Sequence, residues 1–109
     1  MKGLSVAVLA ACLAYTPNPA GAQNVGSPQA GLAFARTVCA ECHAVESKAA
    51  SSPNPAEPTF QRIAGVPGMT ETALYVALQT PHRTMPNLHF EADELRNVAA
   101  YILSLKPTP

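Results

Sequence analysis

Apolar positions recur with the period of an α-helix in four stretches of the chain, which are separated by segments rich in proline and small polar residues. The first stretch covers residues 28–38, where Ser27 is a favourable N-cap and Pro28 takes the first helical position. One face of this predicted helix leads directly into residues 39–43. The members of that face are Gly31, Phe34, Ala35, Val38 and Cys42.

Two shorter helices are predicted in the middle of the chain. Thr59 caps the first, and Gly65 ends it before Pro67. Thr70 caps the second, which stops at Pro81 because the residue before a proline disfavours helical backbone. The apolar positions are Phe60, Ile63 and Ala64 in the first helix and Leu74, Ala77 and Leu78 in the second.

The last predicted helix begins near Glu91. Glu91, Asp93 and Glu94 lie at its start, where negative charge suits the positive end of the helix dipole, and Lys106 and Pro107 close it. Its buried face comprises Leu95, Val98, Ala99, Ile102 and Leu105. The pattern as a whole therefore predicts an all-α protein with three to four helices.

Two segments between the helices are predicted to be irregular. Residues 47–58 are so rich in serine and proline that they suit neither a helix nor a strand. In so small a domain we expect a loop of this length to wrap a surface. Residues 81–88 contain two further prolines, Pro81 and Pro86, and form the second loop.

The length and the charge of the chain narrow its organisation and its partners. A chain of 109 residues allows one domain. Its seven Lys and Arg residues balance its seven Asp and Glu residues, and they form no basic patch. We therefore expect no nucleic-acid partner.

Residues 1–22 have the pattern of a secretory signal peptide. Lys2 supplies the positive start, residues 4–13 are apolar, and residues 20–22 read Ala-Gly-Ala, a cleavage site that would leave Gln23 at the mature N-terminus. The apolar run is too short to span a bilayer. We therefore predict a signal peptide over residues 1–22 and a single domain over residues 23–109.

Cys12 offers an alternative end, since residues 9–12 read Leu-Ala-Ala-Cys and resemble a lipoprotein cleavage box. That reading leaves a signal of only eleven residues, shorter than the usual minimum, so lipid anchoring at Cys12 is the weaker interpretation. Either way the chain is exported, and we expect it in the periplasm.

The chemistry of the chain centres on residues 39–43, which read Cys-Ala-Glu-Cys-His. On a helical turn, residues three apart share a face, so the thiols of Cys39 and Cys42 can each add to one vinyl group on one edge of a porphyrin. His43 follows directly, and its imidazole can reach the iron as an axial ligand. The motif C-x-x-C-H is a signature of covalent haem c attachment.

Two other readings of this motif remain open. A C-x-x-C pair can be a redox dithiol, but that chemistry is typical of a strand–turn–helix setting, whereas residues 28–38 are helical in pattern. The two cysteines can also begin a zinc site. A second C-x-x-C is lacking, and His82 and His89 are not at the H-x₃₋₅-H separation, so haem is the favoured cofactor.

A second candidate ligand is Met85, in the loop over residues 81–88. Its thioether is a soft ligand that suits haem iron, and Met/His ligation raises the potential of electron-carrying haems. Met85 precedes the rigid Pro86 in a loop where a core methionine would be out of place. His82 and His89 are rival axial ligands, although a histidine in a loop is more often a solvated surface group.

With these motifs in place, the sequence resembles the class I cytochromes c, in particular the small monohaem members exported by bacteria. The resemblance covers roughly residues 29–106. It rests on five ordered segments: Gly31-Leu32-Ala33-Phe34, the C-x-x-C-H motif at 39–43, Pro58-Thr59-Phe60, Met85-Pro86, and residues 98–105.

The resemblance implies a fold in which the first and last helices cross around one haem, with Gly31 and Phe34 near Tyr101. It also implies that His43 and Met85 bind opposite faces of the iron. The carbonyl of Pro58 would accept a hydrogen bond from the other ring nitrogen of His43. Glu57 stands where the family often has glycine, so Pro53 or Pro55 remain alternatives for this role.

The expected function is electron transfer without catalysis of a substrate reaction, because an iron with both axial positions filled has no site for a substrate. We expect a monomeric periplasmic carrier that meets redox partner proteins transiently and membranes only through partner complexes. A dedicated subunit of an oxidoreductase complex, and an open-site haem enzyme or gas sensor, are the alternatives. Without Lys2 the chain has six basic and seven acidic residues, a formal charge of −1, so strong electrostatic steering is not expected.

Overall fold

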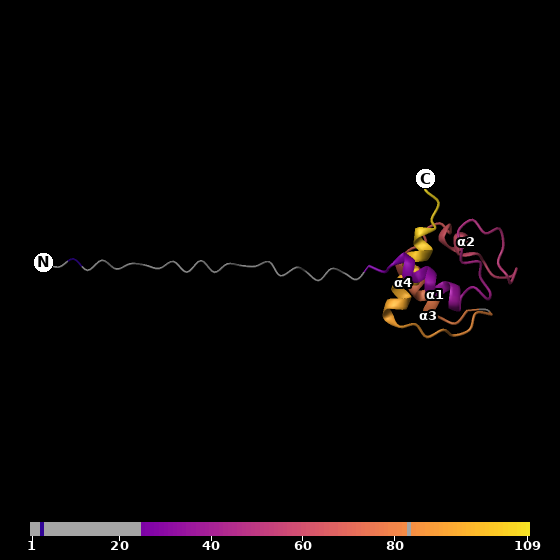
Figure 1. Ribbon diagram of the computed structural model, residues 1–109, viewed down its shortest axis with the longest axis horizontal. Helices are drawn as coiled ribbons and strands as arrows, with labels where there is room; N and C mark the ends of the chain where they lie inside the picture. Colours follow the sequence, from indigo (N-terminus) through magenta and orange to yellow (C-terminus); the bar gives the residue numbers. More distant parts are fainter. Residues whose placement is uncertain (1–2, 4–24, 83) are drawn as a thin grey trace.

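The computed structural model describes residue 3, residues 25–82 and residues 84–109. The described residues form four helices, α1 (Pro28–Val38), α2 (Phe60–Ala64), α3 (Glu71–Gln79) and α4 (Ala92–Ser104), as Figure 1 shows. Within the described residues there is no strand, only an isolated bridge between His82 and Met85. The all-α prediction is confirmed. The expected signal peptide, its cleavage site and Cys12 lie outside the described residues.

Each helix begins at the residue that the sequence predicts. The hydroxyls of Ser27, Thr59 and Thr70 accept hydrogen bonds from backbone N–H groups in the first turns of α1, α2 and α3. Glu91 caps α4 through a capping box with Glu94. These bonds satisfy donors that the helical ladder leaves free, which explains why the starts are encoded locally.

Two details of the helical faces differ from the prediction. The helix α1 ends at Val38, so Cys42 lies in a separate turn rather than on the helix. Leu105 is the C-cap of α4 and only half-buried, whereas Tyr101, which was not assigned to the buried face, is 6% exposed. Tyr101 can be buried because its hydroxyl donates to the carbonyl of Val45.

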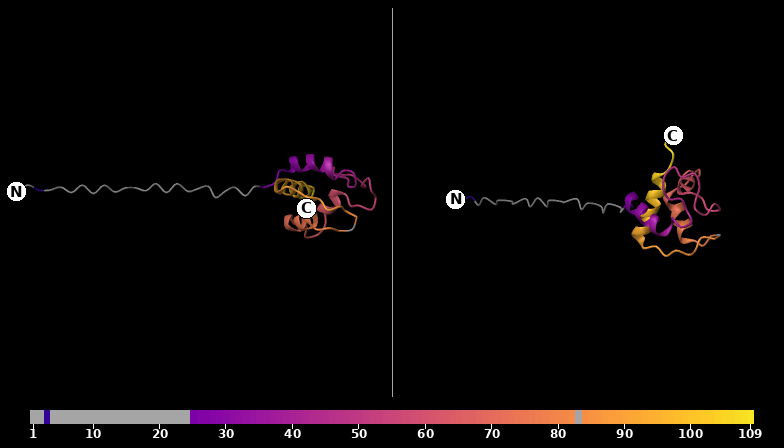
Figure 2. Two further views of the ribbon diagram at one scale, coloured as in Figure 1. Left: turned by 90° about the horizontal axis from the view of Figure 1, so that it is seen from below. Right: turned by 45° about the vertical axis from the view of Figure 1, so that its right-hand side comes forward.

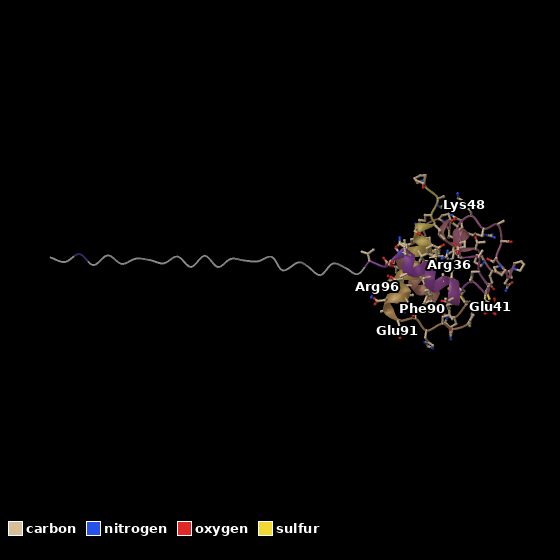
Figure 3. All side chains as sticks on the ribbon, in the orientation of Figure 1. Arg36, Glu41, Lys48, Phe90, Glu91 and Arg96 are labelled. Atoms are coloured by element: carbon tan, nitrogen blue, oxygen red, sulfur yellow. The ribbon has the colours of Figure 1, made fainter. Side chains whose placement is uncertain are left out.

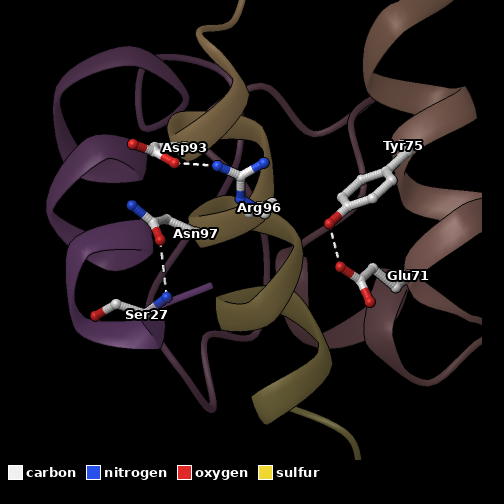
Figure 4. Close-up of polar contacts among 6 residues, drawn as sticks. All are labelled: Ser27, Glu71, Tyr75, Asp93, Arg96 and Asn97. Carbon is white, nitrogen blue, oxygen red and sulfur yellow. Dashed lines mark hydrogen bonds and ion pairs between the residues drawn. The ribbon is translucent and has the colours of Figure 1, made fainter. Parts of the chain in front are cut away.

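The arrangement is organised by the contact between α1 and α4, which cross one another in Figures 1 and 2. The helices can cross this closely because Gly31 has no side chain. A Cβ atom at this position would lie only 2.0 Å from the carbonyl oxygen of Asn97. The side chain of Asn97 also accepts a hydrogen bond of 2.7 Å from the backbone N–H of Ser27, as Figure 4 shows. The start of α1 is thus joined to the middle of α4.

The core lies between this helix pair and the two short helices. Phe60 of α2 packs against Tyr101 of α4 with ring centroids 6.3 Å apart, and Leu74 of α3 is almost completely buried. The ring of Phe34, which the resemblance places near Tyr101, packs against the ring of Phe90. Their centroids are 5.6 Å apart. Met69 packs against the core as a partly buried residue. No helix among the described residues has the length and apolar character needed to cross a membrane.

Candidate functional site

A cavity of about 440 Å³ opens between the end of α1, the loop before α2, the loop between α3 and α4, and the helices α2 to α4. This volume is within the range of small-molecule and cofactor sites. Most of its walls are apolar. They include Val38, Phe60, Ile63, Leu74, Ala77, Leu78, Leu88 and Ile102, together with the residues discussed below.

The C-x-x-C-H motif forms a single helical turn at the mouth of this cavity. The backbone N–H of Cys42 donates to the carbonyl of Cys39 at 3.2 Å, and that of His43 donates to the same carbonyl at 3.0 Å. Both cysteines and His43 line the cavity. The turn therefore brings the two thiols and the imidazole to one site, as the spacing predicts.

The two thiols differ in their surroundings. Cys39 is buried and Cys42 is exposed. Burial raises the pKa of the Cys39 thiol to about 11, because the thiolate would lose its hydration. Zinc ligation would need further ligands, and among the described residues no cluster of three or more His, Cys, Asp or Glu side chains is found.

The imidazole of His43 is held by the loop that precedes α2. Its Nδ1 lies 2.7 Å from the carbonyl oxygen of Pro58, and since a carbonyl only accepts, Nδ1 carries the proton. The other ring nitrogen, Nε2, is left with a lone pair for a metal. The ring also packs against Phe60, with centroids 5.7 Å apart. Pro53 and Pro55, the alternative partners, are exposed.

The path of this loop explains why Pro58 reaches His43. The backbone N–H of Asn54 donates to the carbonyl of Cys42 at 3.3 Å, and that of Phe60 donates to the carbonyl of Ala44 at 2.9 Å. Ser52, buried although it belongs to a Ser/Pro-rich segment, accepts from the N–H of Ala44 at 3.0 Å. The loop thus lies along the motif, and Asn54, Ala56, Glu57 and Pro58 line the cavity.

Met85 lies at the cavity in the loop between α3 and α4. It is half-buried, and its backbone N–H donates to the carbonyl of His82 at 3.1 Å. Of the rival ligands, His82 is exposed but also lines the cavity, with Nδ1 bonded to the carbonyl of Thr80 at 2.9 Å. His89 is exposed and is not part of the cavity wall.

This donor set fits a haem. It offers two thiols from one turn, an imidazole with a free nitrogen, a thioether from the loop between α3 and α4, and an apolar lining that suits a porphyrin. Glu41, between the two cysteines, is exposed at the surface (Figure 3). Glu41 also belongs to the cavity wall.

Several contacts at the site were not predicted from the sequence. Glu57 and Thr84 both line the cavity, and the hydroxyl of Thr84 donates to the carboxylate of Glu57. Ser52 and Tyr101 hold the backbone on either side of the motif, at Ala44 and Val45. None of these contacts carries a local signal, because each joins residues that are far apart or depends on the path of a loop.

The comparisons with known proteins agree with this chemistry. The chain is 35% identical over 78 residues to cytochrome c-552 of Bradyrhizobium diazoefficiens. The aligned region covers 71% of this chain and 73% of that protein. No family model matches the chain, and no solved structure matches it.

Proposed function

Because the chain belongs to the class I cytochromes c, and therefore carries a covalently bound haem c, we propose that it is a soluble electron carrier of the periplasm with His43 and Met85 as the axial ligands. The bound haem supplies a reversible one-electron change between Fe(II) and Fe(III). The residues of this chain would supply the axial ligands, orient them and exclude water.

One observation carries the proposal: His43 and Met85 line the same cavity as the two cysteines of the attachment motif. The hydrogen bond from Nδ1 to Pro58 orients the imidazole and makes Nε2 the better donor. A thioether in the second axial position favours the reduced state and so raises the potential. With both positions filled, a substrate has no place to bind, which favours a carrier over an enzyme.

The cavity walls have a separate role in this proposal. Leu74 and Ile102 are almost completely buried, and they exclude water from the site together with the other apolar residues. A dry pocket disfavours the oxidised, more charged state of the iron. The close crossing of α1 and α4 would help to keep both oxidation states in one geometry.

Localisation and partners belong to the proposal as well. The predicted signal peptide over residues 1–22 supports export to the periplasm. The chain beyond it has a formal charge of −1, so we propose that a monomer meets redox proteins in transient complexes with weak electrostatic steering. Nucleic acid is not a partner, and membranes are reached only through partner complexes.

The test is a redox titration of the mature holoprotein, combined with spectroscopy. A carrier should give one reversible one-electron transition, a low-spin ferric spectrum, and the weak far-red charge-transfer band of a sulfur–iron bond. Electron exchange with a small redox protein should change little between low and high salt. A high-spin ferric spectrum with rapid binding of carbon monoxide to the reduced protein would contradict the proposal and favour an open-site haem enzyme or sensor.

A further inference from the structure

A side-chain hydrogen bond joins the loop that carries Met85 to the loop that carries Pro58, the hydrogen-bond partner of His43. The donor is the hydroxyl of Thr84, which precedes Met85, and the acceptor is the carboxylate of Glu57, which precedes Pro58. Both side chains lie on the wall of the cavity. Figures 1 and 2 show the two loops on the same side of the molecule, beyond the end of α1.

In the part of the loop from Thr80 to Glu91 that the structure describes, few hydrogen bonds restrain the chain near Met85. Among its described residues, the hydrogen bonds of His82 and Met85 stay within the loop, whereas that of Thr84 leaves it. Consecutive Cα atoms are about 3.8 Å apart, so a fixed Thr84 limits how far Met85 can move. The contact with Glu57 is therefore placed to hold Met85 at the cavity.

Backbone hydrogen bonds hold Glu57 in place. Its backbone N–H donates to the carbonyl of Asn54 at 3.0 Å, and the N–H of Asn54 donates to Cys42 of the attachment motif at 3.3 Å. On its other side, Pro58 has a fixed φ and accepts the hydrogen bond of His43. The segment that orients His43 therefore also limits the movement of Thr84.

We propose that the Glu57–Thr84 hydrogen bond is a latch that keeps Met85 on the iron, with Glu57 and Thr84 as positioning residues. The inference rests on the proposed His43/Met85 ligation. Hydrogen bonds to a carboxylate are stronger than neutral ones, so one such bond can shift the balance between bound and released methionine measurably. The latch needs a side-chain acceptor at position 57, which Glu57 supplies in this chain and which glycine would lack.

The test measures how fast carbon monoxide binds the reduced holoprotein at saturating gas, where departure of Met85 limits the rate. Thr84→Val and Glu57→Ala should each bind carbon monoxide about tenfold faster, equivalent to about 1.4 kcal/mol. The double variant should be no faster than either single variant, because both remove the same bond. Glu57→Gln should bind carbon monoxide more slowly than Glu57→Ala, since its amide oxygen still accepts from Thr84, although this neutral hydrogen bond is weaker than the wild-type one.

Two matched controls separate the latch from general effects. Thr72→Val makes the same change at an exposed threonine of α3, and Glu71→Gln removes the charge of an exposed carboxylate outside the cavity wall that likewise accepts a hydroxyl hydrogen bond, from Tyr75. Both should leave the rate unchanged. Hydrogen exchange of residues 80–90 gives a second readout in the same proteins, and it should rise in Thr84→Val and Glu57→Ala only.

The outcomes distinguish the latch from the proposed ligation. If the wild type shows the far-red sulfur–iron band but Thr84→Val and Glu57→Ala change neither rate nor exchange, the latch is wrong and the ligation stands. If Glu57→Gln is as fast as Glu57→Ala, charge rather than the hydrogen bond is responsible, and the latch is again wrong. A wild type without the band overturns the ligation and the latch together.

Discussion

Gly31 of α1 lies against the carbonyl of Asn97 in α4 so closely that a Cβ atom on Gly31 would approach that oxygen to 2.0 Å. The same Cβ would lie 2.8 Å from the Cβ of Tyr101. Both distances are well inside van der Waals contact, so the helices can cross at this depth only with glycine here. The crossing places the end of α1, and with it Cys39, beside the cavity wall that α4 supplies.

Replacing Gly31 by alanine should therefore destabilise the protein. The added methyl group meets backbone that cannot rotate away, and overpacking of this kind costs about 1–3 kcal/mol or more, which outweighs the gain of about 1 kcal/mol in helix propensity. We expect a lower midpoint in guanidinium unfolding of the holoprotein, followed by circular dichroism. Gly65→Ala is the matched control, because a Cβ there would meet only ordinary contacts at 3.5 Å and 3.6 Å. An unchanged midpoint for Gly31→Ala would contradict the close crossing.

Attachment through Cys39 and Cys42 predicts a haem that cannot be extracted. Expressed with a haem c maturation system, the protein should keep one haem through denaturation and acid–acetone treatment. Cys39→Ser combined with Cys42→Ser should leave no covalent haem and little folded protein, because the core forms around the group that fills the cavity. Mass spectrometry and circular dichroism check the two results. Stoichiometric zinc in place of iron would show that the motif has been misread.

Ligation by Met85 predicts which substitution opens the iron. Met85→Ala should remove the far-red sulfur–iron band, admit carbon monoxide readily, and lower the potential by a fraction of the roughly 0.8 V that axial ligands span. His82→Ala and His89→Ala should change neither the spectrum nor ligand access. His82→Ala is the more informative control, because His82 also lines the cavity. Loss of a ligand in His82→Ala but not in Met85→Ala would assign a bis-histidine haem instead.

The predicted signal peptide defines the mass of the exported protein. After expression in a bacterium with export intact, the intact mass should equal residues 23–109 plus one haem, with or without cyclisation of Gln23. The measurement is electrospray mass spectrometry of the periplasmic fraction. A lipid-modified chain beginning at Cys12 would show that the alternative cleavage site is used.

The helices could be predicted from the sequence because their signals are local. Ser27, Thr59 and Thr70 each bond to a backbone N–H three residues later, so a cap and its partner are read in one short window. The attachment motif is equally local, since Cys39, Cys42 and His43 belong to a single turn. Met85 was predicted as a ligand in another way, from a ligand chemistry that suits iron and a loop that does not suit a core residue.

The remaining contacts were decided by tertiary structure. Which proline carbonyl meets His43 depends on how residues 47–58 fold along the motif, and the structure places Pro58 there rather than Pro53 or Pro55. The partners of Phe34, Ser27 and Thr84 are likewise distant in sequence. The sequence by itself determined the helices, their caps and the chemistry of the attachment turn. Only the packing of α1 on α4 and of the two loops on the cavity decided which distant groups meet, because such contacts depend on the summed geometry of all elements rather than on the propensity of any one.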